Sequence, residues 1–428
     1  MNNFPNGFKC YIDNTDCNKS YCITLVIRVG SCLERDNERG ISHFLEHMLF
    51  KGTNKYKNLP YILDINGFQY NAMTMKECTM FYIKSSKIDK IQLIMDLLYQ
   101  IAFHSLIDYD NFSTEKTVVM DEILEDQSNI NTVLYDMGEE ILFDPIYFKK
   151  SIDNYKCNIT GNNDDIDKLT LQSVKNFYKK YYTVDNMFIV CTGNIGNHSN
   201  ILNSLENTFL LENSKFTAGI INNNNSIITN RRKPIVKGIK QDDDSSGTLI
   251  INYPICGFDN INRYILNLYS YILTKGISSD LFELLRNKNG IVYTIESSTD
   301  LYYKCFGIFN ISFTTNTNNI LKALELIFNF LKSNINNKQL EKAKILYIEE
   351  LIFSSEDIVK HGEKIAFDIL YNCPVMSNEQ EAHLINNITL DDINTIKNKY
   401  IKNQQTVIIH MSNIEDVEIK NFIEEYFI

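Results

Sequence analysis

The sequence predicts an α+β protein built from two homologous domains, and two observations support this. Stretches rich in β-branched residues alternate, in both halves, with stretches whose apolar residues recur at helical spacing. The halves also repeat: residues 170–195 align without gaps with residues 389–414, a constant offset of 219. We therefore expect two α/β-sandwich domains, each a mostly antiparallel sheet packed with helices.

The elements of the first half follow from local patterns. Strands are expected at residues 21–29, 69–74, 79–82 and 186–190. Helices are expected at residues 41–51, 61–66, 88–103, 115–124 and 169–182. In the second half, residues 265–276 align with the helix at 41–52, and residues 341–351 with the helix that begins at Glu115.

The segment that joins the two halves differs in composition from both of them. It contains the asparagine run 222–225, the basic residues 231–233 and the acidic residues 242–244. Such a change is typical of a linker. We predict a first domain over residues 1–212, a linker over 213–247 and a second domain over 248–428.

One apolar stretch, residues 41–50, carries His43, Glu46 and His47. On a helix these side chains share one face. Burying three ionisable groups is costly unless a charge compensates them, and a divalent metal held by two imidazoles does so. The pattern is the H-x-x-E-H metallopeptidase signature. The alternative is a buried helix with three hydrogen-bonded polar side chains.

A third ligand is expected from the helix at 115–124. Glu115 and Glu122 are seven residues apart and therefore share a helical face, two turns from each other. Helical glutamates are usually solvated, but a zinc site with two histidines lacks one protein ligand. In the second half, Asn267 and Tyr271 align with His43 and His47. Ser270 aligns with Glu46, and Ile348 aligns with Glu122. Only the first half is therefore expected to bind a metal.

The composition excludes several classes of protein. Hydrophobic residues make up 44% and charged residues 22%, as in a soluble globular protein. A net charge of −11 without a basic stripe argues against nucleic-acid binding. No apolar run is long enough to span a membrane. Scattered cysteines without C-x-x-C and an N-terminus without a targeting pattern predict a reduced, cytoplasmic protein.

These motifs resemble the pitrilysin, insulinase and mitochondrial processing peptidase family of inverted zincins. The resemblance spans most of the chain and rests on residues 5–7, 29–31, 40–53, 71–74, 115–122, 182, 186–187, 193, 278–282 and 286–293. It implies that His43, His47 and Glu122 bind Zn²⁺. It also implies that Glu46 is the general base for the zinc-bound water and that Glu115 supports the site from behind the ligands.

The resemblance also implies substrate contacts and a partner. The segment with Asn71 and Ala72 resembles the edge strand that pairs with extended peptide. Arg286 and Tyr293 match a pair that, in full-length members, reaches the active site from the opposite half and stabilises the oxyanion. Here the opposite half would be another chain, so the resemblance implies a dimer in which this pair acts in trans.

The expected function is therefore a zinc endopeptidase that cleaves small flexible peptides in a dimeric clamshell chamber. Two alternatives stay open. One is the catalytic subunit of a heterodimeric protease for leader-peptide removal or modified-peptide maturation. The other is a non-catalytic scaffold subunit, because some members of the family lose the motif.

Overall fold

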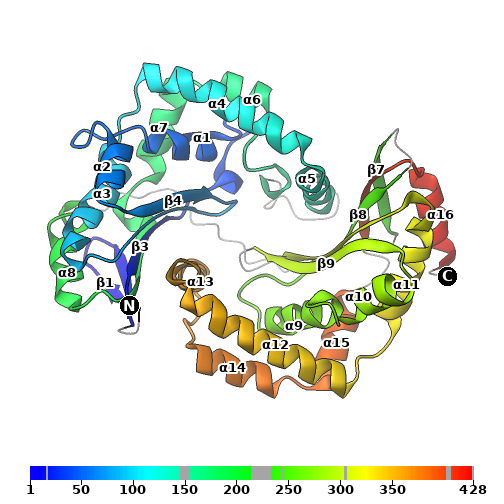
Figure 1. Cartoon of the computed structure of the whole chain (residues 1–428). Helices are drawn as coiled ribbons and strands as arrows, with labels where there is room; N and C mark the ends of the chain where they lie inside the picture. Colours follow the sequence, from blue (N-terminus) through cyan, green and yellow to red (C-terminus); the bar gives the residue numbers. More distant parts are fainter. Residues whose placement is uncertain are drawn as a thin grey trace. The chain divides into compact units, whose positions relative to one another are not determined.

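A computed structural model describes residues 1–15, 18–144, 154–213, 233–241, 245–302, 306–401 and 406–426. These residues form two compact units, each a sheet packed with helices (Figure 1). The first unit takes its described residues from Met1–Glu125, Cys157–Asn222 and Phe353–Val375. The second takes them from Asp126–Lys156, Asn223–Ile352 and Met376–Ile428. The expected α+β architecture with two sheets is confirmed.

The sheet of the first unit has, among the described residues, six strands in the order β1-β2-β6-β3-β5-β4. Their bounds are β1 (Asn2–Asn3), β2 (Lys9–Asn14), β3 (Tyr21–Ile27), β4 (Gln69–Thr74), β5 (Thr79–Ser85) and β6 (Met187–Gly193). All pairs are antiparallel except β2 with β6. This order leaves β4 at an edge, where its described pairing is with β5 alone.

The sheet of the second unit has, in the described ranges, five strands in the order β7-β11-β8-β10-β9. Their bounds are β7 (Ile235–Lys240), β8 (Gly247–Ile255), β9 (Val292–Leu301), β10 (Gly307–Thr315) and β11 (Val407–Ser412). Only β11 with β7 pairs in parallel among them. Both sheets are therefore mostly antiparallel, as expected.

Helices cover each sheet (Figure 1). In the first unit they are α1 (Ile41–Leu49), α2 (Leu59–Ile65), α3 (Ile91–His104), α4 (Tyr109–Ser128), α6 (Asn163–Lys168), α7 (Leu171–Tyr181), α8 (His198–Glu206) and α13 (Ile358–Leu370). In the second they are α5 (Ile130–Leu142), α9 (Asn262–Thr274), α10 (Asp280–Phe282), α11 (Ile320–Lys332), α12 (Asn337–Glu356), α14 (Asn378–Asn387), α15 (Leu390–Tyr400) and α16 (Asp416–Tyr426). The last three residues of α4 and the C-terminal end of α12 fall on the other side of the division between units.

The repeat seen in the sequence is present in the structure. Helices α7 and α15 begin and end at residues that differ by 219, the offset of the sequence alignment. Each is preceded by a threonine, Thr170 or Thr389, whose hydroxyl accepts a hydrogen bond from the third helical N–H. Both helices therefore begin with the same capping-box arrangement, which fixes where the chain enters the helix.

The central strand β3 is buried on both faces. Its seven residues are all buried, although strand side chains alternate between the two faces. Tyr21, Ile23, Leu25 and Ile27 belong to the main hydrophobic core, on the side of α1. The alternate residues, which include Thr24 and Val26, face the side that α13 covers. Cover on both faces explains why the sequence of this strand is almost continuously apolar.

Two helices each pack on a sheet whose strands come mainly from the other half of the chain. Helix α5, from the first half, packs on β8 and β11, and α13, from the second half, packs on β3 and β6. Each meets its sheet through a glycine. A Cβ on Gly138 would lie 3.0 Å from Asn252 Nδ2, and one on Gly362 would lie 3.3 Å from Thr192 Oγ1. These close approaches favour glycine at both positions.

Polar contacts hold both ends of α13 on its sheet. At the first turn, Thr192 Oγ1 donates to the carbonyl of Ile358 over 2.8 Å. At the last turn, Arg28 Nη1 donates to the carbonyl of Leu370 over 2.9 Å. A cation at a helix C-terminus is favourable because it interacts with the helix dipole. The position of α13 is thus fixed by residues far away in the sequence.

Much of the expected linker lies outside the described residues. These include the asparagine run 222–225, Arg231, Arg232 and the acidic residues 242–244. Within the expected range 213–247, residues Ile235–Lys240 form β7, which pairs with β11. The boundaries at 212 and 248 stay predictions.

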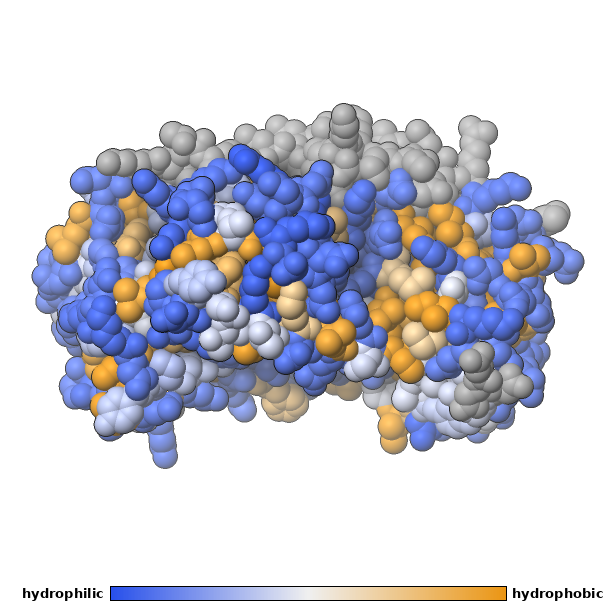
Figure 2. All heavy atoms as spheres, turned by 90° about the horizontal axis from the view of Figure 1, so that it is seen from above, coloured by the Kyte–Doolittle hydropathy of each residue, from blue (hydrophilic) through white to orange (hydrophobic). Residues whose placement is uncertain are grey.

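The described residues contain no helix long and apolar enough to cross a membrane. The face of the molecule drawn in Figure 2 is mainly hydrophilic, with small apolar patches among the polar side chains. The cysteines in the described ranges are free thiols, most of them buried.

A fragment of residues 1–212 lacks α13 and should not fold independently. Its sheet would expose buried residues on the face that α13 covers, including Val26, Phe188 and Val190. We expect this fragment to bind a hydrophobic dye and to unfold without a cooperative transition. Co-expression with residues 233–428 should restore one cooperative transition in thermal unfolding. A cooperatively folded 1–212 monomer would contradict this.

Candidate metal centre

Helix α1 is positioned by a buried glutamate at its N-terminus. Glu34 accepts hydrogen bonds from the N–H groups of Gly40 (2.9 Å) and Ser42 (2.8 Å), which have no partner within the helix. Burial raises the pKa of Glu34 to about 7, and these hydrogen bonds oppose the rise. Gly40 has a φ of 78°, and a Cβ there would lie 2.4 Å from Thr160 O. The start of α1 therefore needs glycine.

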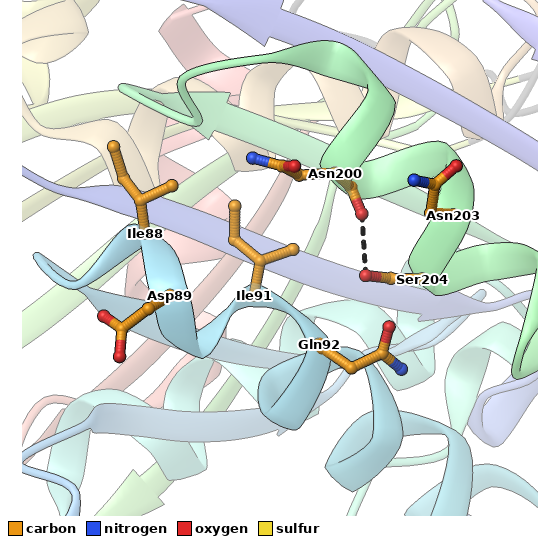
Figure 3. Close-up of a pocket in the computed structure, with 7 residues that line it drawn as sticks. All are labelled: Ile88, Asp89, Ile91, Gln92, Asn200, Asn203 and Ser204. Atoms are coloured by element: carbon orange, nitrogen blue, oxygen red, sulfur yellow. Dashed lines mark hydrogen bonds between the residues drawn. The ribbon is translucent and has the colours of Figure 1, made fainter.

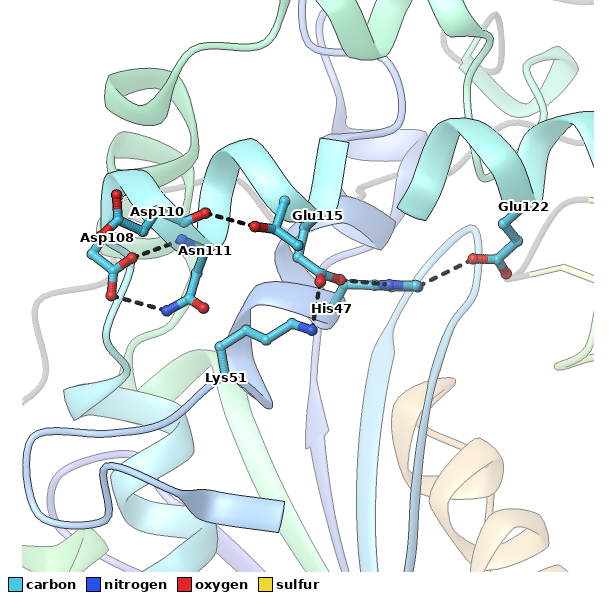
Figure 4. A network of polar contacts seen from close by, with 8 residues as sticks. His47, Lys51, Asp108, Asp110, Asn111, Glu115 and Glu122 are labelled. Carbon is cyan, nitrogen blue, oxygen red and sulfur yellow. Dashed lines mark hydrogen bonds and ion pairs between the residues drawn. The ribbon is translucent and has the colours of Figure 1, made fainter. Parts of the chain in front are cut away.

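Three possible metal ligands converge between α1 and α4. Nε2 of His43 lies 3.6 Å from Oε1 of Glu122. Nε2 of His47 lies 3.3 Å from Oε2 of Glu122 (Figure 4). The ligand atoms of the three residues all lie within 4.8 Å of one another. Two imidazoles and one carboxylate form a donor set that fits a zinc ion with an open position. The structure thus brings together the residues that the family resemblance named as ligands.

The pKa values of the two histidines are shifted in opposite directions. Burial, together with the neighbouring His47, lowers the pKa of His43 to about 4, so its imidazole is neutral near pH 7. Burial acts to lower the pKa of His47 as well, but the hydrogen bond to Glu115 and the nearby carboxylates outweigh it and raise the pKa. A neutral imidazole is the form that binds metal. His43 is therefore already in the binding form, whereas a metal would displace a proton from His47 at lower pH.

Glu115 contacts His47 of α1 and Lys51, which follows the end of α1 (Figure 4). Residues 41–51, from the start of α1 to Lys51, are called the α1 segment. It is 2% exposed, its Oε2 lies 3.3 Å from His47 Nδ1, and its Oε1 pairs with Lys51 Nζ. Burial acts to raise the pKa of Glu115, but these two partners hold it below its usual value. An ionised Glu115 accepts a hydrogen bond from the protonated Nδ1 of His47, which leaves Nε2 of His47 facing Glu122.

Glu46, between the two histidines, is hydrogen-bonded from the edge strand. Thr74 Oγ1, at the end of β4, donates to Glu46 Oε2 over 2.9 Å. Burial raises the pKa of Glu46, and the Thr74 hydrogen bond opposes the rise. A carboxylate with a raised pKa beside a metal site is suited to accept and return a proton.

The expected substrate contacts Asn71 and Ala72 lie on β4, the strand that also carries Thr74. Asn71 is exposed and Ala72 is partly buried. Because the described pairing of β4 is with β5 only, one edge of its backbone has no described strand beside it. The edge position expected from the resemblance is thus present, and Thr74 connects this strand to Glu46.

Arg286 and Tyr293 lie in the second unit and so are not part of the metal group. Arg286 Nη1 donates to the backbone carbonyl of Tyr293 over 2.7 Å. Both side chains are exposed, Tyr293 to 57%. The two residues therefore sit side by side on the surface of their unit, with side chains open to a partner or ligand.

The second unit lacks the metal chemistry at the equivalent position. Tyr271, which aligns with His47, packs against Tyr347 with ring centroids 5.2 Å apart. Asn267, which aligns with His43, pairs with Thr299 Oγ1. Aromatic packing and a neutral hydrogen bond take the place of the ionisable side chains.

Sequence reasoning gave no role to Thr74 or Lys51. Both contacts are made between separate elements, Thr74 from β4 to α1 and Lys51 from the end of α1 to α4. Periodicity reports only which residues of one element share a face, so it gives no signal for such pairs.

A cavity of about 450 Å³ lies between the start of α3 and α8 (Figure 3). It is lined by Ile88, Asp89, Ile91, Gln92, Asn200, Asn203 and Ser204. No member of the metal group lines it, and Asp89 is the one ionisable side chain in that lining. We assign it no chemistry.

The fold and this site together define a duplicated α+β protein with a candidate metal centre at its H-x-x-E-H motif. A sequence model of "Insulinase (Peptidase family M16)" matches residues 10–147, and one of the "Peptidase M16 inactive domain" matches residues 168–347. The chain belongs to this family of peptidases, M16.

Relatives and solved structures agree with this assignment. An uncharacterized zinc protease of Rickettsia felis is 28% identical over 93% of this chain and 94% of its own. The mitochondrial-processing peptidase subunit beta of Neurospora crassa is 24% identical over 91% of this chain and 82% of its own. The structure of a Helicobacter pylori protease matches with a TM-score of 0.83 at 20% identity, over 96% of this chain and 98% of that one. The last match shows the shared two-domain fold.

Replacing Thr74 should impair turnover more than substrate binding. Thr74→Val removes one hydrogen bond to Glu46, and a loss of about 1.4 kcal/mol corresponds to a roughly tenfold lower kcat. We expect KM for a peptide within about twofold of wild type and unchanged zinc content. Thr74→Ser keeps the hydroxyl and should retain most of the rate. Equal kcat for Thr74→Val and wild type would show that this contact does not support Glu46.

Proposed function

We propose that this protein is a zinc-dependent endopeptidase for short, flexible peptides. The observation that carries the proposal is the convergence of His43, His47 and Glu122, with Glu46 on the same helix and the edge strand β4 joined to it through Thr74. Two relatives are named as zinc proteases, which supports zinc as the metal.

The proposed chemistry divides the work among a few side chains. His43, His47 and Glu122 would hold a zinc ion, which when bound lowers the pKa of water and polarises a carbonyl. Oε2 of Glu46 accepts the Thr74 hydrogen bond, which would leave Oε1 available to the attacking water. Glu46 takes the proton from this water and returns it to the leaving amine. Glu115 holds the ring of His47 in place.

The edge strand would bind the substrate backbone. An extended peptide that pairs with the open edge of β4 makes main-chain hydrogen bonds, which place few demands on its side chains. Asn71 is exposed on this strand and would contact the peptide near Glu46. An extended strand next to the catalytic base favours flexible peptides over folded proteins, because a folded protein seldom offers an unpaired strand.

We further propose that two copies of this chain form the working enzyme. Arg286 and Tyr293 are adjacent and exposed, as required of residues that serve a site on a partner chain. The name of the Neurospora relative, a subunit, is in keeping with assembly into a larger enzyme. A heterodimer with a related subunit is the alternative, and a native mass measurement distinguishes the two.

Glu46→Gln should abolish cleavage and leave zinc binding intact. Loss of a general base costs about 10²- to 10⁴-fold in kcat. Glu122→Gln should instead lose zinc, whereas Glu125→Gln, an exposed glutamate on the same helix, should keep both zinc and activity. The measurements are zinc content and cleavage of a quenched fluorescent peptide, with and without a chelator.

Two results would contradict the endopeptidase. Cleavage that persists in Glu46→Gln or in chelator would show that another protein or another site is responsible. A wild-type protein that binds zinc but cleaves no member of a peptide library would favour a scaffold subunit.

Mixing two inactive variants tests the dimer. A Glu46→Gln chain and a Tyr293→Phe chain together should regain about a quarter of wild-type activity, because half of the randomly paired dimers contain one intact site. Each variant alone is the control. Absence of any rescue, when native mass shows mixed dimers, would exclude action of Tyr293 in trans.

A further inference from the structure

Lys51 and His47 reach the same buried carboxylate from one side of the α1 segment. They are four residues apart, so they lie on one face, one helical turn from each other. Oε2 of Glu115 faces His47 Nδ1, and Oε1 pairs with Lys51 Nζ (Figure 4). Each oxygen of Glu115 therefore has one partner from this segment.

The backbone around Lys51 is fixed. The N–H of Lys51 donates to the carbonyl of Met48, which continues the helical turn beyond the end of α1. Gly52 follows with a φ of 140°, and a Cβ there would lie 2.4 Å from the carbonyl oxygen of Lys57. Only glycine fits this turn, so the backbone directly after Lys51 is held in one conformation.

This ion pair differs from an ordinary surface pair. Exposed pairs contribute little because water screens both charges. Here Glu115 is 2% exposed, whereas the Lys51 side chain is 36% exposed. A buried carboxylate oxygen that loses its partner is left unsatisfied, which is costly, so the carboxylate would turn to find another partner. Turning moves Oε2 away from Nδ1 and removes the acceptor that holds the His47 ring.

We propose that Lys51 is a positioning residue that fixes the carboxylate of Glu115 and, through it, the orientation of His47 for metal binding. This inference rests on the proposed function, because it assigns Lys51 a role toward the same zinc site. Lys51 contacts neither a proposed ligand nor the proposed substrate strand directly, so its effect must pass through Glu115.

The test is zinc affinity, measured by competition with a fluorescent chelator on the purified full-length protein. Lys51→Met should bind zinc about 10- to 100-fold more weakly, the usual effect of removing a group that orients a metal ligand. Lys51→Arg keeps a cationic donor and should stay within about threefold of wild type. Lys57→Met, at an exposed lysine close by in the sequence, is the matched control and should not change affinity.

A double-variant cycle shows whether the effect passes through Glu115. In the Glu115→Gln background, adding Lys51→Met should cause no further loss of zinc affinity. The thermal midpoint of the metal-free protein separates this role from a general loss of stability, and it should be the same for Lys51→Met and Lys57→Met within a few degrees.

Three outcomes would overturn the inference. The first is zinc binding by Lys51→Met within twofold of wild type, and the second is that the losses of Lys51→Met and Glu115→Gln multiply in the double variant. In either case the zinc peptidase stands and only the role of Lys51 fails. A wild-type protein that binds no zinc overturns the proposed function together with this inference.

Discussion

The packing of α4 against α1 is the constraint on which the metal centre depends. Glu115 and Glu122, two turns apart on α4, each lie 3.3 Å from a different nitrogen of His47. Phe112, Val119 and Ile123 are buried on α4, and Phe112 meets Phe44 of α1 with ring centroids 5.2 Å apart. These apolar contacts fix the rotation of α4 about its axis. A rotation by one residue, about 100°, would remove both carboxylates from His47.

The same helix joins the site to the rest of the chain. Helix α4 ends at Ser128, and Asn129 caps α5, which packs on the sheet of the second unit. Helix α13 comes from the second half of the chain and packs on strands β3 and β6 of the first unit. Each half of the chain therefore completes the core of the other unit, and the element that supplies Glu122 is tied at its C-terminal end to the second unit.

Duplication has kept the frame and changed the chemistry. Helix α9 repeats α1 and β11 repeats β6, yet Tyr271 packs against Tyr347 at a tilted angle where His47 would meet its carboxylates. An apolar and aromatic interior holds no charge to compensate, whereas His43, Glu46 and His47 are ionisable groups that are at least partly buried. This difference explains why, among the described residues, the candidate metal centre lies in the first unit.

The sequence by itself determined the local features of this protein. Periodicity located α1, α4, β4 and β5, and the constant offset revealed the duplicated fold. The H-x-x-E-H motif identified two candidate ligands, and the family resemblance named Glu122 as the third. Each of these signals lies within one element or one alignment. Tertiary structure alone decided which helix covers which sheet, as α5 and α13 show. It also decided the pairs Thr74 with Glu46 and Lys51 with Glu115. Such contacts join residues from different elements, so their existence depends on how whole elements pack and not on any local pattern.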